Sequence, residues 1–267
     1  MSTIDLAGAS ALDTGATGGI GHAIARHLRR AGAELVLTGR RTDVLEPLAT
    51  ETGGRALAVD LTVRDEVDRL AGECADVDIL VANAALPASG DLRSFSVEEI
   101  DRALEVNLRA PMVLARVLGD RMAQRGRGHI VFVSSLSGKS GQRGSAVYSA
   151  TKFGLRGFAH ALREDLRDSG VGVSVVLPGF IRDSGMFHDS GVKLPGFVGT
   201  KTPEDVAAAV LRAIERDRAE IDVAPLGLRA GAAFGGLAPE LSARVQRRLG
   251  GARVADAMAQ GQRDKRA

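Results

Sequence analysis

The chain of 267 residues has no tryptophan, one tyrosine and one cysteine. A single cysteine, Cys74, cannot form an intrachain disulfide, which fits a reducing compartment, and we expect it to be a packed residue. No stretch reaches the ~18 uninterrupted apolar residues that a membrane-spanning helix needs. Met1–Ala11 also lacks a basic segment followed by an apolar run of signal-peptide length. We therefore expect a cytoplasmic protein without a membrane span.

The chain also lacks an excess of charge of one sign. Its 35 Lys and Arg nearly balance 33 Asp and Glu, so the pI near 9.0 reflects a small surplus of bases. Because the chain lacks a dense basic field, no nucleic-acid partner is expected. We also expect no metal site. The composition, 45% hydrophobic and 25% charged, is ordinary for a globular protein. At this length we expect one α/β domain over residues 1–267.

Short apolar runs rich in β-branched residues alternate along the chain with segments of helical periodicity. The runs are continuously apolar, which is typical of strands covered on both faces. Repeated strand and helix predict a doubly wound parallel sheet of about seven strands with helices on both faces. The clearest runs are Leu35–Leu37, Ala56–Val59, Ile79–Val81, Ile130–Val133 and Val173–Leu177.

The C-terminal part of the chain has a different pattern. Pro203 after Thr202 predicts a helix start, with Thr202 as its cap. Beyond Pro225 a Gly/Ala-rich segment, Leu226–Leu237, leads into a basic, helix-like segment, Leu241–Leu249. We interpret residues from about 226 to 267 as an added arm with a frayed end from residue 260. Two interpretations of this arm stay open, a self-packing arm, which we favour, and a membrane-surface helix. The basic residues beside its apolar positions are Arg229, Arg244, Arg247 and Arg248.

A glycine cluster, Thr14–Gly21, stands between a strand-like segment and an amphipathic helix. Glycines let the backbone turn tightly and approach a pyrophosphate, and a helix N-terminus offers free N–H groups and a favourable dipole. Turns also collect glycine for structural reasons alone. The position of the cluster in a βαβ unit favours the phosphate-binding interpretation.

The residues at the end of the second strand bear on which dinucleotide binds. Gly39 stands where an NAD-binding protein would place a carboxylate for the adenosine ribose, and Arg40 and Arg41 follow. A guanidinium suits a 2′-phosphate, which an aspartate would repel. We therefore expect NADP rather than NAD. The alternative is a pair of solvated arginines that opens a surface helix.

Tyr148 and Lys152 lie four residues apart, a spacing that places both on one face of a helix. A free phenol has a pKa of ~10, but a nearby ammonium favours the phenolate and brings proton transfer into range. Tyr148 is the only tyrosine, and Ser135 lies thirteen residues upstream at the end of a predicted strand. Each residue alone has an ordinary structural explanation, but their order and spacing after the glycine cluster favour a catalytic group.

In these features the chain, from about Leu6 to Val223, resembles the short-chain dehydrogenase/reductase family, the type with TGxxxGIG and YxxxK motifs. The resemblance implies a Rossmann-like fold and an NAD(P)-dependent enzyme that moves a hydride between the nicotinamide and a carbonyl or secondary alcohol. By this resemblance Tyr148 exchanges the substrate proton, Lys152 holds the nicotinamide ribose and tunes Tyr148, Ser135 bonds the substrate oxygen and Asn107 supports a water relay. The alternative is a cofactor-binding regulator of the same fold without turnover.

The resemblance also implies a set of cofactor-binding residues. Asp60 resembles the family aspartate that bonds the adenine. The stretch Val81–Ala85 resembles the family's NNAG segment with Asn83 kept, and Leu177–Ile181 resembles the segment that meets the nicotinamide amide. Where the family commonly has threonine, this chain has Asp183, followed by Ser184. The full set is Gly15, Thr17, Gly18, Gly19, Ile20, Gly21, Gly39, Arg40, Arg41, Asp60, Leu61, Asn83, Ala84, Ala85, Tyr148, Lys152, Pro178, Gly179 and Ile181.

The segment Ser184–Lys201 mixes glycines with apolar residues. It suits a mobile lid over a largely apolar substrate or a surface loop tied down by its own apolar residues, and both stay open. The residues concerned are Gly185, Met186, Phe187, Gly191, Leu194, Gly196, Phe197, Val198 and Gly199. The resemblance further implies a homodimer or homotetramer that pairs through the helices from Val97 and from Tyr148.

Asp13 does not fit the predicted fold. It lies directly before Thr14, where the first strand should be buried, and the family normally has an aliphatic residue there. Because burying an unpaired carboxylate is costly, Asp13 must find a hydrogen-bond donor, become protonated or loosen the strand.

Overall fold

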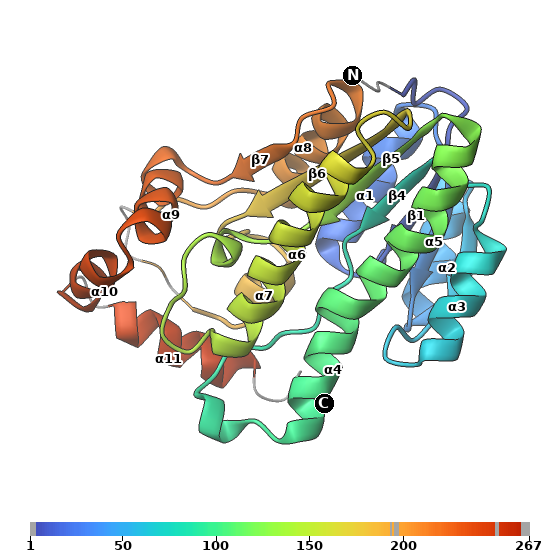
Figure 1. Ribbon diagram of the computed structural model, residues 1–267. Helices are drawn as coiled ribbons and strands as arrows, with labels where there is room; N and C mark the ends of the chain where they lie inside the picture. Colours follow the sequence, from blue (N-terminus) through green and yellow to red (C-terminus); the bar gives the residue numbers. More distant parts are fainter. Residues whose placement is uncertain (1–3, 193, 195–197, 249–250, 263–267) are drawn as a thin grey trace.

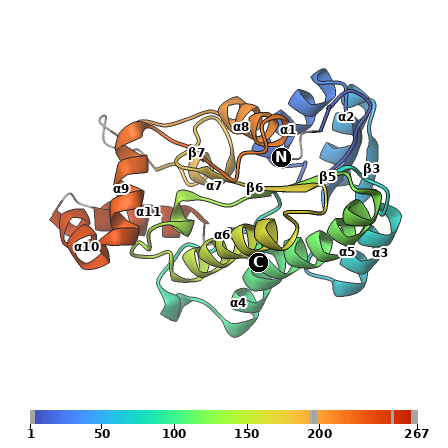
Figure 2. The same ribbon diagram turned by 45° about the horizontal axis from the view of Figure 1, so that its top comes forward.

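The computed structural model describes residues 4–192, 194, 198–248 and 251–262. Its centre is a parallel sheet of seven strands in the order β3-β2-β1-β4-β5-β6-β7, with helices on both faces (Figures 1 and 2). The predicted doubly wound, Rossmann-like α/β fold is confirmed. The strands are β1 (Ser10–Thr14), β2 (Glu34–Gly39), β3 (Arg55–Ala58), β4 (Ile79–Ala82), β5 (Gly128–Val133), β6 (Val171–Pro178) and β7 (Glu220–Val223).

Two apolar layers hold the helices on the sheet. On one face pack α1 (Gly19–Arg30), α2 (Thr42–Thr52) and α8 (Pro203–Glu215). On the other face pack α3 (Arg64–Glu73), α5 (Ala110–Arg125) and α6 (Ala146–Asp165), and Cys74 is buried among them as expected. In β5, Ile130 and Phe132 belong to the second layer, whereas Val131 and Val133 belong to the first. Burial on both faces is why this strand reads as an unbroken apolar run.

Shorter helices and the C-terminal segment lie around this frame. They are η1 (Leu92–Ser94), α4 (Val97–Leu104), η2 (Glu105–Arg109), η3 (Leu136–Gly138), α7 (Gly185–His188), α9 (Leu226–Leu237), α10 (Pro239–Arg248) and α11 (Gly251–Gln262). The Gly/Ala-rich segment is therefore helical. Leu249, expected in the basic helix, and residues 263–267 of the expected frayed end lie outside the described residues. Residues 260–262 were also expected to be frayed, but they form the last turn of α11, so that part of the prediction is wrong. No helix in the described part of the chain is both long and apolar enough to cross a membrane.

The predicted start of α8 is confirmed. The Thr202 hydroxyl accepts a hydrogen bond from the Asp205 backbone N–H, and the Asp205 carboxylate accepts one from the Thr202 N–H, both at 3.1 Å. Pro203 occupies the first turn, where its missing N–H costs nothing. This reciprocal pair ends the preceding loop and fixes where α8 begins.

Asp13 lies in β1 with no exposed surface, and neither carboxylate oxygen has a hydrogen-bond partner among the described residues. The strand is not loosened, because Asp13 pairs in register with Leu37 of β2 and Val81 of β4. Burial raises the pKa of Asp13 well above its ordinary value. Of the three outcomes open to Asp13, protonation is therefore the one that the structure supports.

Strand order reverses between β1 and β4, which lie next to each other although they are far apart in the sequence. In open α/β sheets the crevice beyond the carboxyl ends of the strands at such a switch point is where ligands bind. The loops that leave β1, β4, β5 and β6 are therefore the expected location of a ligand site.

Candidate functional site

The glycine cluster after β1 packs so tightly that side chains are excluded at two positions. Gly15 has φ +72°, and a Cβ there would stand 2.6 Å from the Ala84 Cα. A Cβ on Gly21 would meet the Gly15 carbonyl and stand 2.7 Å from the Ala16 Cα. Because only glycine fits, the turn closes directly onto the N-terminus of α1 and leaves a cradle free of side chains.

Hydrogen bonds tie this cradle to the loop after β4. The Thr14 hydroxyl accepts from the backbone N–H groups of Asn83 (3.1 Å) and Ala84 (3.2 Å). The Asn83 side chain donates to the carbonyls of Thr14 (3.1 Å) and Gly15 (3.3 Å). The two loops therefore form one rigid unit at the switch point. Thr14, predicted only as the start of the cluster, carries the hydroxyl that joins them.

The end of β2 also meets the cradle. A Cβ on Gly39 would stand 2.6 Å from the Thr17 Cγ2, so a side chain at position 39 would have to displace the Thr17 side chain. The Arg41 guanidinium donates to the Thr17 carbonyl at 2.5 Å. Arg40 and Arg41 are both exposed. The structure thus places the Arg41 guanidinium at the edge of the cradle, and the neighbouring Arg40 is exposed at the end of β2.

Asp60 follows β3 at the same edge of the sheet. Its Oδ1 accepts from the Thr62 N–H (2.9 Å) and the Thr62 hydroxyl (2.8 Å), and its own N–H donates to Glu66 Oε2 (2.7 Å). The neighbouring Leu61 is buried. These bonds fix the Asp60 carboxylate at the end of β3, and its Oδ2 takes part in none of them.

Ser135, Tyr148 and Lys152 come together where β5 and β6 end. The hydroxyls of Ser135 and Tyr148 share a hydrogen bond, and Ser135 Oγ also lies 3.5 Å from the Pro178 carbonyl. The Lys152 ammonium donates to the Val133 carbonyl at 3.0 Å and lies 5.7 Å from the centre of the Tyr148 ring. The predicted three-residue group is therefore assembled from a strand end and one face of α6.

The electrostatics of this group differ from the sequence-based expectation. Burial raises the pKa of Tyr148 to about 12, and the hydrogen bond from Ser135 offsets only part of that rise. Burial also lowers the pKa of Lys152, whose side chain is almost fully enclosed, to about 8. We expected the ammonium to favour the phenolate, but the cost of burying a phenolate is the larger effect. At neutral pH Tyr148 is a neutral phenol, which can donate a proton.

Asn107 is fully buried in η2, a π-helical segment between α4 and α5. Its Oδ1 accepts from the Leu86 N–H (2.6 Å) and its Nδ2 donates to the Leu86 carbonyl (2.9 Å). The side chain therefore fixes the loop after β4, and both of these bonds go to Leu86 rather than to the Ser135, Tyr148 and Lys152 group. π-Helical turns inside longer helices are frequent at functional sites.

The segment after β6 passes over the cradle. The Gly179 backbone N–H donates a hydrogen bond to the Val223 carbonyl at 3.0 Å. The buried Ile181 forms a parallel β-bridge with Lys201. Asp183 has φ 70° and turns its exposed side chain toward Arg182, 3.4 Å away. Ser184 instead places its Oγ against Gly19, where this buried oxygen has no hydrogen-bond partner among the described residues. Ser184 is absent from the predicted cofactor set, although its hydroxyl directly after Asp183 was a usable signal.

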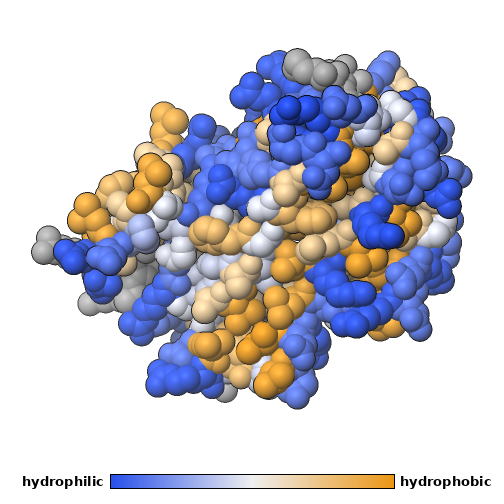
Figure 3. Space-filling view, in the orientation of Figure 1, coloured by the Kyte–Doolittle hydropathy of each residue, from blue (hydrophilic) through white to orange (hydrophobic). Residues whose placement is uncertain are grey.

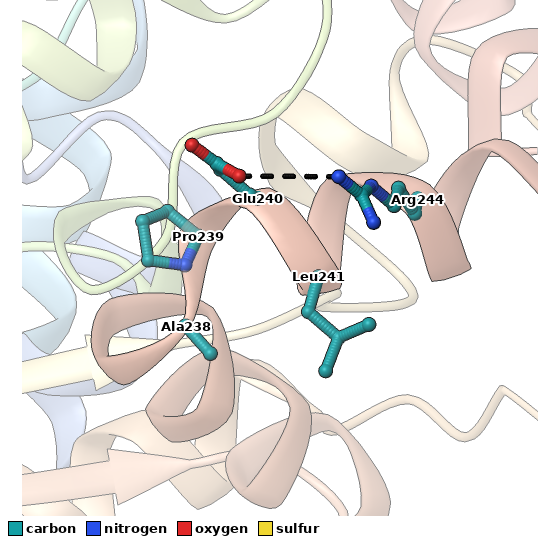
Figure 4. A pocket seen from close by; sticks show the side chains of 5 residues that line it. All are labelled: Ala238, Pro239, Glu240, Leu241 and Arg244. Carbon is teal, nitrogen blue, oxygen red and sulfur yellow. Dashed lines mark ion pairs between the residues drawn. The ribbon is translucent and has the colours of Figure 1, made fainter.

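The predicted lid begins with the short helix α7, and the Phe187 ring lies 5.0 Å from that of Phe180. Gly196 and Phe197, which were part of that prediction, lie outside the described residues. A separate pocket between α9 and α10 (Figure 4) contains none of the predicted site residues. It is lined by Ala238, Pro239, Glu240, Leu241 and Arg244.

A glycine cradle at the switch point of a parallel sheet, with a serine, tyrosine and lysine group beside it, defines a dinucleotide-dependent oxidoreductase. Residues 9–193 match the family model described as short chain dehydrogenase, and the chain belongs to that family. Members of this family bind a nicotinamide cofactor, and the chain is an enzyme that acts on C=O or CH–OH groups of small molecules.

Three relatives illustrate the similarity. The chain is 37% identical over 227 residues to the ketoacyl reductase HetN of Nostoc sp. (strain PCC 7120), covering 82% of this chain and 79% of the relative. It is 34% identical over 217 residues to the 3-oxoacyl-[acyl-carrier-protein] reductase FabG of Rickettsia bellii, covering 78% and 89%. A short-chain dehydrogenase from Sphingobium yanoikuyae, solved in complex with NADPH, superposes with a TM-score of 0.76 at 28% identity, covering 88% and 95%.

Proposed function

We propose that the protein is an NADPH-dependent reductase of 3-oxoacyl compounds, which carry a ketone beside an apolar chain. The observation that carries the proposal is the hydrogen-bonded Ser135 and Tyr148 pair with the Lys152 ammonium beside it. The names of the relatives, ketoacyl reductase and 3-oxoacyl-[acyl-carrier-protein] reductase, support this substrate class. The partly exposed Met186 and Phe187 on α7 suit an apolar chain.

The cradle fits a dinucleotide. The positions where a Cβ would collide with backbone, Gly15 and Gly21, leave room for a pyrophosphate at the N-terminus of α1. In our proposal Arg40 and Arg41 bind the 2′-phosphate of NADP, and Asp60 and Leu61 meet the adenine. The loop Asn83–Ala85 and the segment Pro178–Ile181 flank the two ends of the cofactor. The NADPH complex of the Sphingobium enzyme supports the choice of cofactor.

The chemistry follows from the protonation states. NADPH, when bound, would supply the hydride for the carbonyl carbon of the substrate. Ser135 donates a hydrogen bond to the carbonyl oxygen, and the Tyr148 phenol gives that oxygen its proton, so that the product is a secondary alcohol. Lys152, charged below its pKa of about 8, holds the nicotinamide ribose and stabilises the tyrosinate that forms. Asn107 is proposed to support the relay that returns the proton from solvent.

The hydroxyl that faces the cofactor in this chain is assigned to Ser184 rather than to position 183. The Ser184 Oγ is buried beside Gly19 without a protein partner among the described residues, so a phosphate oxygen of the cofactor can accept its hydrogen bond. Asp183 is turned toward Arg182, which keeps a carboxylate away from the cofactor phosphates. The acid at the usual threonine position is thereby accommodated.

We also propose a cytoplasmic homo-oligomer. Hydrophobic side chains gather over the helices on one face of the molecule (Figure 3). The exposed large hydrophobic residues of the chain include Val97, Leu104 and Phe153. They lie on α4 and α6, the helices through which the chain is expected to pair. Sedimentation velocity of the wild type and of a Phe153→Glu variant tests the assignment. A variant that stays the same size as the wild type would exclude this surface.

The decisive experiment on the reaction uses Tyr148→Phe. With acetoacetyl-N-acetylcysteamine as substrate, NADPH oxidation is expected to fall by about a hundredfold or more, because a proton donor contributes roughly 10²–10⁴-fold. NADPH binding, followed by its fluorescence, is expected to change less than about threefold, since the phenol contributes little to affinity. Full turnover by Tyr148→Phe would refute the mechanism, and the absence of NADPH binding by the wild type would refute the function.

A further inference from the structure

The chain continues after β7 into three helices that lie beyond residue 193, where the family model ends. The first, α9, packs on η3, directly after Ser135. A Cβ on Gly235 would stand 2.8 Å from the Ser140 Cβ, and one on Gly236 would stand 3.1 Å from the Lys139 carbonyl. The chain thus leaves the sheet by running along the loop that carries the catalytic serine.

The last helix, α11, lies at the lower left of the molecule, below α9 (Figure 1). It contacts α7 through a hydrogen bond. The Gln262 side chain, 2% exposed, donates a hydrogen bond to the Met186 carbonyl at 3.2 Å. Gly261 lies flat on the turn that ends α7, where a Cβ would stand 2.7 Å from the Ser190 Cα. Two adjacent residues of α11 therefore contact α7 near its start and the turn just after its end, although α7 is only four residues long.

The N-terminal end of α7 is held in place by the residue that precedes it. Ser184 rests on Gly19 of the cradle, and Phe187 packs on Phe180, which directly follows Gly179. Without neighbours, a single helical turn is unstable in water, because its nucleation is unfavourable. The position of α7 therefore depends on the contacts at its two ends, the cradle and α11.

We propose that α11 is part of the substrate site, with Gly261 and Gln262 as positioning residues that hold α7 over the substrate and thereby set which acyl chains are accepted. This inference rests on the proposed function. Met186 and Phe187 form the apolar surface that α11 holds in place. The expected substrate feature is an acyl chain long enough to pass the carbonyl group and reach that surface.

A matched pair of variants tests the contact. Gly261→Ala pushes a methyl group into the Ser190 backbone, whereas Gly231→Ala, also within a helix of the arm, adds a methyl group to open space. Hydrogen exchange of the amides at Asp189, Ser190 and Gly191, which close the turn after α7, is expected to speed up about tenfold in Gly261→Ala. Gly231→Ala is expected to exchange like the wild type.

The kinetic readout separates a substrate-site role from a merely structural one. With 3-oxododecanoyl-N-acetylcysteamine, KM is expected to rise about tenfold in Gly261→Ala and in Gln262→Ala, while kcat stays within about twofold. With the short acetoacetyl thioester and for NADPH, both variants are expected to match the wild type. The inference would be overturned if KM rose equally for both thioesters, or if KM stayed unchanged while amide hydrogen exchange became faster. Either result would leave the proposed reductase function intact. If the wild type did not bind NADPH at all, the proposed function itself would instead be refuted.

Discussion

The Ser184 hydroxyl lies against Gly19, so that a side chain on Gly19 could not coexist with it. This contact joins the first turn of the fold to the segment that follows the last central strand. It also leaves a buried hydroxyl without a partner among the described residues, next to a backbone shaped for phosphate. A buried donor without an acceptor costs free energy, and a bound phosphate oxygen would relieve that cost.

Ser184→Ala is therefore expected to weaken NADPH binding. A hydrogen bond to a charged group contributes about 1.5–3 kcal/mol, so the dissociation constant should rise by roughly tenfold or more. NADPH fluorescence can follow the titration directly, because the protein has no tryptophan. Asp183→Asn is the control, since asparagine tolerates the positive φ at this position and the side chain points away. If Asp183→Asn weakens binding and Ser184→Ala does not, the assignment is wrong.

The two arginines after β2 are expected to act differently. Arg40→Ala should raise the dissociation constant of NADPH by about tenfold and leave that of NADH unchanged, because its proposed target is the 2′-phosphate. Arg41 also bonds the Thr17 carbonyl, so Arg41→Ala should weaken both cofactors by loosening the cradle. Parallel titrations with NADPH and NADH measure the ratio. If Arg40→Ala changed the dissociation constants of NADPH and NADH by the same factor, Arg40 would be only a solvated surface charge.

Much of this architecture can be predicted from the sequence because it depends on local patterns. The strands appear as apolar runs since both faces of the sheet are covered, and the start of α8 is visible because Thr202 and Asp205 form a reciprocal cap. The catalytic group was also predictable, because Tyr148 and Lys152 share a helix face and Ser135 ends a strand.

Contacts between distant segments could not be predicted in this way. Nothing in the sequence around Gly261 indicates that it meets Ser190, and nothing around Asn107 indicates that it bonds Leu86. The sign of the Tyr148 shift was also missed, because the i and i+4 spacing shows the ammonium but not the depth at which the phenol is buried. Burial is a property of the whole fold, and it outweighs the neighbouring charge here.

Asp13 should make stability depend on pH. At low pH its carboxyl is protonated in both the folded and the unfolded chain. Above pH ~4 the unfolded chain loses this proton while the folded chain keeps it, so the free energy of unfolding falls by at most about 1.4 kcal/mol per pH unit until the raised folded pKa is reached. Asp13→Val should therefore raise Tm by about 5 °C or more at pH 8, and by less at pH 5.

Thermal melts at the two pH values, followed by circular dichroism, check this expectation. Asp13→Asn is the informative control, because it cannot ionise but leaves polar atoms buried without partners. It should remove the pH-dependent difference from Asp13→Val without reaching the same Tm. An Asp13→Val protein that melts at or below the wild-type temperature at pH 8 would contradict the burial of an unpaired acid.

Tyr148 can be titrated directly, because it is the only tyrosine and the chain has no tryptophan, so phenolate absorbance reports one group. Burial raises its pKa to about 12. At pH 10.5 the folded protein should therefore show roughly 3% phenolate, against about 75% in urea, where the pKa returns to ~10.

Removing the Ser135 hydrogen bond with Ser135→Ala should push the pKa of Tyr148 higher still, because that bond favours the phenolate. The same shift makes the folded state lose stability as pH rises from about 10 to 12, since only the unfolded chain releases the proton there. Circular dichroism at pH 10.5 establishes that the chain is still folded. If the folded protein then shows as much phenolate as the unfolded chain, Tyr148 is not held as a neutral proton donor, and the direction of proton transfer proposed for carbonyl reduction would have to be abandoned.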